Sequence, residues 1–344
     1  MRNSLIIISL FSGLLIAQPS FSAADIDGGA DGGESVFAAD MDGDGDMDVV
    51  SASYSYDTIA RYENNGATDP SWSAANIATS ADGATSVFVA DMDNDGDMDI
   101  VSASANDDAI AWYENDGATD PSWTAADIAT SADGAQSVFV ADVDSDGDLD
   151  IICGNRNGKI EWLLNQGTDK KADWIIHDLN VSQIDVGSFS KPLLNDMDRD
   201  EDYDLLIGNS KGLIIYYENQ GDKNRPHFVL RNTRISGIQM EGNASPALWN
   251  WNKDEHLDLV VGGREGFLSL VSHLPPKRLP ALRGWKLEAT HWQNIKSAGY
   301  STPHFSDIDR DNKSDLLIGD EQGNLRYWIN GGLSIKKKEN QENI

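Results

Sequence analysis

One string of nine residues, rich in aspartate, stands at six places in the chain. Residues 91–99 read DMDNDGDMD, and nearly the same letters stand at 40–48 and 142–150. Carboxylates held this close together repel one another, so a tight turn that contains them needs a compensating cation. Oxygen atoms at positions 1, 3 and 5 converge when the chain coils, and glycine at position 6 permits the positive φ of the turn. The pattern indicates a site for Ca²⁺, which takes six to eight oxygen ligands, and is less suited to Mg²⁺, which keeps its waters.

The strings, called loops 1 to 6 from here on, become less regular along the chain. They begin at Asp40, Asp91, Asp142, Asp196, Asn250 and Asp307, with spacings of 51 to 57 residues. Loops 1 to 3 are complete, whereas Glu201 in loop 4 and Asn312 in loop 6 replace the turn glycine. Loop 5 keeps only two of its carboxylates, Asp254 and Asp258. We therefore expect three calcium sites in loops 1 to 3 and two further candidates in loops 4 and 6.

An EF-hand is the obvious alternative, and the sequence argues against it. That motif needs helices on both sides and a glutamate at position 12. Position 12 is Ser51, Ser102 or Cys153 in the first three copies, and both flanks are rich in β-branched residues. The carboxylate that closes the site is instead the residue at position 9.

The segments around each loop predict the elements that position it. Every loop lies between two apolar runs, for example SVFVAD before loop 2 and MDIVSAS after it, and a third run (AIAWYEND) and a fourth follow. These runs are short, β-branched or aromatic, and bounded by Gly, Asn, Asp or Pro, as strands are. A single four-stranded sheet cannot bury both of its faces, but six sheets packed around an axis can. The sequence thus predicts an all-β fold, a β-propeller of six blades with four antiparallel strands each.

The two ends of the repeat array complement each other. Residues 22–37 align with 124–139, so we expect the mature N-terminus to begin with the last strand of a blade. The final repeat ends after its third strand, NLRYWINGG. We expect the N-terminal strand to supply the missing fourth strand and to close the ring.

At this point the loops and their flanks resemble a known family. The strings VFVADMDNDGDMDIVSAS and LLNDMDRDEDYDLLIGN are similar to FG-GAP (VCBS-type) repeats, the calcium-binding propeller units of integrin α-subunit heads. The resemblance implies that the side chains at positions 1, 3, 5 and 9 and the carbonyl at position 7 hold Ca²⁺. In loops 1 to 3 it identifies Asp40, Asp42, Asp44, Asp46, Asp48, Asp91, Asp93, Asp95, Asp97, Asp99, Asp142, Asp144, Asp146, Asp148 and Asp150. In loops 4 and 6 it identifies Asp196, Asp198, Asp200, Asp202, Asp204, Asp307, Asp309, Asp311, Lys313 (through its carbonyl) and Asp315.

The charge of the chain excludes one class of partner. The 344 residues carry a net charge of −31, which argues against nucleic acid because phosphate binding needs a basic face. Residues 1–153 hold 30 acidic and two basic residues, whereas residues 154–344 are nearly balanced. Carboxylates are therefore concentrated where the loops are most regular.

The single cysteine is explained by its place in the repeat. Cys153 stands eleven residues after the start of loop 3, where the other copies have Ser, Ile or Val, so we expect a small buried side chain. One residue later all six copies have alanine or glycine. That regularity predicts a close approach between the backbones of neighbouring blades.

The N-terminus has the features of a secretory signal peptide. Arg2 precedes an apolar run from Leu5 to Ile16 that is too short to span a bilayer, and small residues follow. We expect residues 1–22 to be the signal, with cleavage after Ser22 or Ala24. The propeller would then occupy 23–332 and a polar, disordered tail 333–344. The expected location is extracellular, or periplasmic, and no later segment could span a membrane.

Two classes of function agree with these features. The first is a monomeric binding or adhesion module that presents a rigid ring to a protein or glycan at an extracellular surface. The second is a hydrolase or lyase that acts on polysaccharide, although the six histidines show no metal or catalytic spacing. Trp72 and Trp123, in matching DPSW segments, could stack on sugars or could cover a strand edge.

Overall fold

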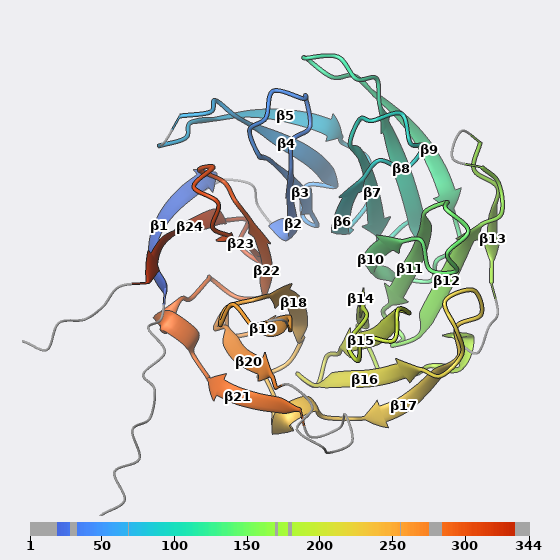
Figure 1. The fold of residues 1–344 in the computed structure, drawn as a ribbon. Helices are drawn as coiled ribbons and strands as arrows, with labels where there is room; N and C mark the ends of the chain where they lie inside the picture. Colours follow the sequence, from blue (N-terminus) through green and yellow to red (C-terminus); the bar gives the residue numbers. More distant parts are fainter. Residues whose placement is uncertain are drawn as a thin grey trace, which may run out of the picture.

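The computed structural model describes residues 19–333 except 28–32, 68, 169–170, 178–180, 255 and 275–283. Six four-stranded antiparallel sheets stand around a central axis as the blades of a propeller (Figure 1). No α-helix occurs in the described residues, which contain three 3₁₀ turns, η1 (Val181–Gln183), η2 (Ile235–Gly237) and η4 (Trp292–Asn294). The prediction of an all-β propeller with six blades is confirmed.

The blades follow the chain, and each runs from an innermost to an outermost strand. Blades 1 to 3 consist of β2 (Gly33–Ala39), β3 (Asp48–Ser53), β4 (Thr58–Asn64), β5 (Trp72–Ala78); β6 (Ala84–Ala90), β7 (Asp99–Ser104), β8 (Ala109–Asn115), β9 (Trp123–Ala129); and β10 (Ala135–Ala141), β11 (Asp150–Asn155), β12 (Ile160–Asn165), β13 (Trp174–Ile176). Blades 4 to 6 consist of β14 (Lys191–Asn195), β15 (Asp204–Gly208), β16 (Ile214–Asn219), β17 (Phe228–Asn232); β18 (Ser245–Trp249), β19 (Asp258–Gly262), β20 (Ser269–His273), β21 (Trp285–Ala289); and β22 (Ser301–Ser306), β23 (Asp315–Asp320), β24 (Leu325–Leu333) with β1 (Pro19–Asp27).

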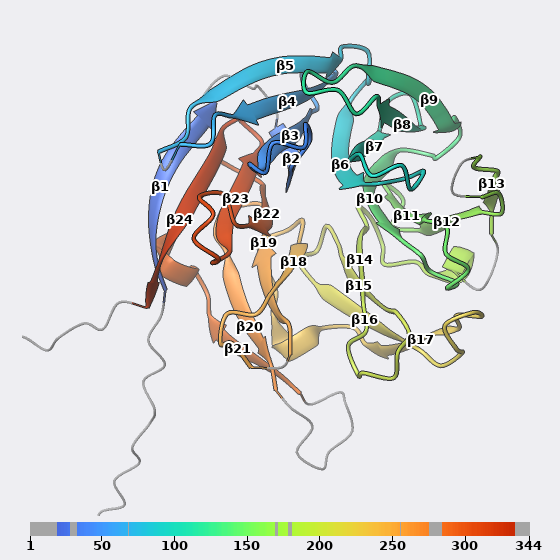
Figure 2. The same cartoon turned by 45° about the horizontal axis from the view of Figure 1, so that its top comes forward.

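The ring closes through the two ends of the repeat array. Strand β1 is the outermost strand of blade 6 and pairs antiparallel with β24, from Asp27 opposite Leu325 to Pro19 opposite Leu333 (Figure 2). The expected closure by the N-terminal strand is therefore confirmed. The strand begins four residues before the earlier of the two expected cleavage sites, and the ring of Phe21 packs edge-on against Trp292. Most of the expected signal and nearly all of the expected tail lie outside the described residues.

The hydrophobic core lies between the faces of neighbouring blades. The second strand of each blade is buried along its whole length, because it is covered by another sheet on both sides. Cys153 belongs to this buried set, as expected, and burial raises the pKa of its thiol. The glycines one residue after the Cys153 position of the repeat have no room for a side chain. A Cβ on Gly208, for example, would lie 2.0 Å from the carbonyl oxygen of Ala244 in the next blade. The predicted close approach of blade backbones is confirmed at this position.

The strand order places all six loops on one face of the ring. Each loop connects the first strand of a blade to the second, so we call this face the loop face. The hairpins between second and third strands, and the connections from one blade to the next, lie on the opposite face. None of the helices in the described part of the chain has the length and apolar character of a bilayer-crossing segment.

Candidate metal centre

Three carboxylates converge in five of the six loops. The side chains at positions 1, 3 and 5 each offer an oxygen atom, and in each loop these atoms lie within 4.8 Å of one another. The groups are Asp40, Asp42 and Asp44; Asp91, Asp93 and Asp95; Asp142, Asp144 and Asp146; Asp196, Asp198 and Asp200; and Asp307, Asp309 and Asp311. These are the five loops that the sequence selected.

Hydrogen bonds from backbone N–H groups to aspartate side chains hold the loops in a coiled shape. In loop 2 the carboxylate of Asp91 accepts hydrogen bonds from the N–H groups of Asp95 and Gly96, both at 3.0 Å. The N–H of Asp97 donates to Asp95 at 2.9 Å. The position-6 residue has positive φ, as the sequence predicted, with values of 101° at Gly96 and 72° at Glu201. The side chain of Glu201 makes this conformation strained in loop 4.

A second residue with positive φ was not foreseen from the sequence. Position 4 also adopts the left-handed conformation in every loop, from 57° at Asn94 to 74° at Gly43. The residue type varies there, and even Lys253 and Arg310 adopt it. Only Gly43 and Asn94 are residues that favour this region, so composition gave little indication of it.

The position-9 aspartates lie beneath the loops in the core. Asp99 is 1% exposed, and its two oxygens accept hydrogen bonds from the N–H of Asn115 (2.8 Å) and the N–H of Met92 (3.1 Å). The equivalent bonds recur in loops 3, 4 and 6. Burial raises the pKa of Asp99 to about 7. Position 9 thus joins the loop to the third strand, and it is not among the convergent groups of positions 1, 3 and 5; its role as a further ligand stays a prediction.

The third-strand residues that donate this hydrogen bond were missed in the sequence. The third strand ends in asparagine in blades 1 to 4 and in His273 in blade 5, and in blade 6 Asn330 takes the same place within the longer β24. The backbone N–H of the asparagine donates a hydrogen bond to the carboxylate at position 9. In blade 2 the side chain of this asparagine also accepts a hydrogen bond from the N–H of Gly117 in the following turn (3.1 Å). The recurring pairs EN, LN and IN at the end of the third run were the signal that could have revealed it.

Loops 2 and 3 each carry, at position 3, a buried oxygen that fits a cation. Within the described chain, Oδ1 of Asp93 and Oδ1 of Asp144 are buried and have no hydrogen-bond partner. Burial, and then the neighbouring carboxylates of Asp95 and Asp146, raise the pKa of these groups. A buried carboxylate oxygen without a partner is costly, and native structures pair such groups. The donor set, three or more carboxylate oxygens with free lone pairs, fits a hard divalent cation such as Ca²⁺.

Loops 5 and 6 satisfy some of their acceptors internally. In loop 5 the side-chain amide of Asn252 donates to a carboxylate oxygen of Asp254 at 3.0 Å, and that of Asn250 donates to its carbonyl. In loop 6 the ammonium of Lys313 pairs with Asp311, although both side chains are about one-third exposed. The sequence had assigned Lys313 only a carbonyl role.

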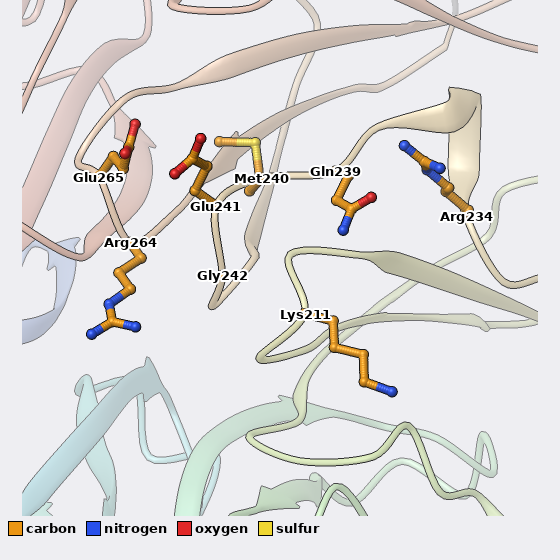
Figure 3. Close-up of a pocket in the computed structure, with 8 residues that line it drawn as sticks. All are labelled: Lys211, Arg234, Gln239, Met240, Glu241, Gly242, Arg264 and Glu265. Atoms are coloured by element: carbon orange, nitrogen blue, oxygen red, sulfur yellow. The ribbon is translucent and has the colours of Figure 1, made fainter.

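A shallow polar cleft lies on the opposite face. It lies between blades 4 and 5, with a volume of about 890 Å³ (Figure 3). Lys211, Arg234 and Arg264 line it together with Glu241 and Glu265. The two glutamates lie side by side, and their mutual hydrogen bond raises the pKa of Glu241, whereas Lys211 and Arg264 project from two neighbouring hairpins (Figure 3). The cleft therefore gathers three cations on a strongly acidic protein.

The axis of the ring holds an aromatic belt. Phe37, Phe88 and Phe139 occupy the same register on the innermost strands of blades 1 to 3, with ring centroids 4.8 and 5.0 Å apart. His304 occupies the same register in blade 6, and the centroid of its ring lies 4.3 Å from that of Phe37. Burial lowers the pKa of His304 to about 4. Trp72, one of the two tryptophans considered for sugar stacking, is half-buried against Tyr327 of blade 6.

Comparisons with known proteins agree with this architecture. A family model described as "FG-GAP-like repeat" matches residues 40–102 and 91–153. No curated protein matches the chain. Among solved structures, two crystal structures of BBS1N in complex with ARL6DN, soaked with lead or with mercury, are similar in fold, with TM-scores of 0.54 and 0.53. They share 11% and 12% identity and cover 94% and 93% of this chain and 99% of the other. The chain is therefore a β-propeller with six blades that contains FG-GAP-like repeats within residues 40–153.

Proposed function

We propose that this propeller is a secreted binding module whose loops are stabilised by Ca²⁺. The observation that carries the metal proposal is the buried, unpaired Oδ1 of Asp93, repeated at Asp144. In both loops the atom belongs to a group of three convergent carboxylates. Residues at positions 1, 3 and 5 would hold the ion, and the carbonyl at position 7 would add a ligand.

The role of the ion would be structural. Ca²⁺ supplies positive charge at the point where the carboxylates repel one another. The protein's own contribution is the coiled backbone, which holds the oxygens together before the ion arrives. An ion that binds only the folded chain stabilises it by mass action. Extracellular modules of this kind bind calcium at ~10⁻⁴–10⁻³ M, which suits a secreted protein.

Thermal unfolding in calcium, magnesium or EDTA tests this proposal. We expect a higher melting temperature in calcium than in EDTA, and a smaller effect of magnesium. The double substitution Asp93→Asn and Asp144→Asn should remove most of the calcium effect. The matched control is Asp82→Asn, an aspartate on the opposite face outside the loops. Superimposable melts of the native chain in calcium and in EDTA would refute the metal proposal.

The cleft between blades 4 and 5 supports the binding role. Its three cations outnumber the two glutamates that line it, and it lies in the half of the chain whose charges nearly balance. The guanidinium of Arg264 lies 5.9 Å from the ring centroid of Tyr300, and Arg234 is held by the carbonyl of Ile238. A shallow polar hollow with fixed guanidinium groups suits a carboxylate- or sulfate-bearing glycan.

A glycan array with the native protein tests the ligand. We expect binding to anionic glycans that is lost when Lys211 and Arg264 are both changed to Ala. Lys286→Ala is the matched control, because Lys286 pairs with Glu288 outside the cleft. Binding that survives the double change places the ligand elsewhere, and capture of an acidic peptide in place of a glycan would favour a protein ligand.

A further inference from the structure

Loop 1 differs from loops 2 and 3 in a residue that lies outside the loop. On the third strand, Arg61 stands opposite Val50. The same register holds Trp112 in blade 2 and Trp162 in blade 3. The three loops themselves are nearly identical in sequence. Any difference in how they treat a cation should therefore come from residues that contact the loops from outside, and this third-strand residue is the most buried of them.

Arg61 is buried and holds two aspartates of loop 1. Its Nη2 lies 2.6 Å from Oδ2 of Asp42 at position 3, and its Nε donates to Oδ2 of Asp48 at position 9 (3.0 Å). The three side chains are 7%, 3% and 1% exposed. Hydrogen bonds between charged groups in such a dry setting are short and strong, and a guanidinium stays protonated.

The contrast with loops 2 and 3 is direct. There the position-3 carboxylates, Asp93 and Asp144, each have a buried oxygen without a partner. In loop 1 the carboxylate at the same position, Asp42, is paired with the guanidinium of Arg61. One oxygen of loop 1, Oδ1 of Asp40, still has no hydrogen-bond partner in the described chain. Arg61 thus supplies positive charge to Asp42 and Asp48, whereas Asp40 keeps an oxygen without a partner.

A second arginine reaches loop 1 from the last blade. Nη2 of Arg310 in loop 6 lies 2.5 Å from Oδ1 of Asp46 and donates to the carbonyl of Gly66 at 3.1 Å. The side chain of Arg310 is 51% exposed, so this contact is weaker than that of Arg61. Together the two arginines change the charge at loop 1 from −5 to −3, whereas loop 2 keeps five aspartates.

We propose that Arg61 is the resident cation of loop 1, and that this loop folds without Ca²⁺ and binds it poorly. The inference rests on the proposed calcium binding at loops 2 and 3. An ion that enters loop 1 must separate a buried ion pair or forgo Asp42, so we expect its affinity there to be at least about tenfold lower. Blade 1, beside the closing blade, would then keep its loop when calcium is scarce.

Exchanging the two third-strand residues tests the inference. We would measure bound calcium by equilibrium dialysis with radioactive calcium, for the native chain, Arg61→Trp and Trp112→Arg. Arg61→Trp gives blade 1 the residue of blade 2 and should raise the count by one ion per chain. Trp112→Arg makes the reciprocal change and should lower the count by one. Arg61→Met gives a second version of the first change if the larger ring disturbs packing.

The melting temperature in EDTA provides a second readout. Arg61→Trp should lower it, because Asp42 and Asp48 lose their partner, and Trp112→Arg should leave it unchanged or raise it. Ion counts that do not change in either variant, with a native chain that binds calcium, would overturn the inference and leave the proposed function intact. A native chain that binds no calcium would refute the proposed function itself.

Discussion

Substitution of Asp99 should destabilise the chain whether or not calcium is present, whereas substitution of Asp93 should do so only in calcium. Asp99 accepts buried hydrogen bonds from the N–H groups of Asn115 and Met92, so Asp99→Ala leaves two buried donors without partners. Each such donor costs about 1–3 kcal/mol. Relief of the buried carboxylate, whose pKa is raised to about 7, offsets part of this loss. We expect a net loss of about 2–3 kcal/mol in the free energy of unfolding, with or without calcium.

Asp93→Asn should be nearly neutral in EDTA and destabilising only in calcium. In the absence of the ion the substitution removes a buried carboxylate that has an unpaired oxygen and repels Asp95. In the presence of the ion it weakens a ligand, and the stabilisation by mass action is lost.

Urea unfolding of the native chain and both variants, in excess EDTA and in excess calcium, measures these effects. The tryptophans report the transition. Two outcomes would refute the reasoning. One is Asp99→Ala with native stability in EDTA, which would mean that position 9 does not hold the loop to the third strand. The other is Asp93→Asn with the same loss in both solutions.

Three further predictions follow from the packing. Burial lowers the pKa of His304 to about 4 from about 6.5 in the unfolded chain. As pH falls, the unfolded state therefore takes up the proton first. The free energy of unfolding should decrease as pH falls from about 6.5 to 4, by at most about 3 kcal/mol. The melting temperatures of His304→Phe and the native chain should diverge over this range and agree at pH 8, and a difference that stays constant with pH would contradict the assignment. Gly208→Ala should lower the free energy of unfolding in urea by about 1–3 kcal/mol, because the added Cβ would meet the carbonyl of Ala244. The same loss is not expected for Ala103→Gly at the equivalent position of blade 2. Equal stability of Gly208→Ala and the native chain would show that the blades can separate there. A truncated chain that begins at Gly33 lacks β1 and exposes the edge of β24. Because an exposed strand edge can pair with another chain, light scattering should show association of the open ring. A monomer with the native melting temperature would show that the closure by β1 is dispensable.

The fold could be read from the sequence because each level of the repeat agrees with the others. The alternating aspartates, the turn glycine and the short β-branched runs recur in one register, and residues 22–27 supply the strand that the last repeat lacks. The small residue at Gly208 was informative for the same reason, since blades 3 to 6 each meet the next blade closely at this point. Repetition therefore turned local patterns into a prediction of packing.

The parts that could not be predicted depend on contacts between distant residues. Arg61 stands in a register otherwise filled largely by aromatic residues, and only the folded blade brings it against Asp42 and Asp48. The hydrogen bond from Asn115 to Asp99 likewise joins residues on different strands. The left-handed conformation at position 4 reflects the coiling of the loop and has no consistent residue type, so it left no signal in the sequence.

The most direct test of the account is a crystal structure of the native chain grown in calcium, with an anomalous difference map recorded at long wavelength. The account predicts peaks in loops 2 and 3 among the oxygens of positions 1, 3 and 5, adjoining Oδ1 of Asp93 and Oδ1 of Asp144. A map without a peak at either loop, at a calcium concentration that saturates extracellular modules, would contradict it.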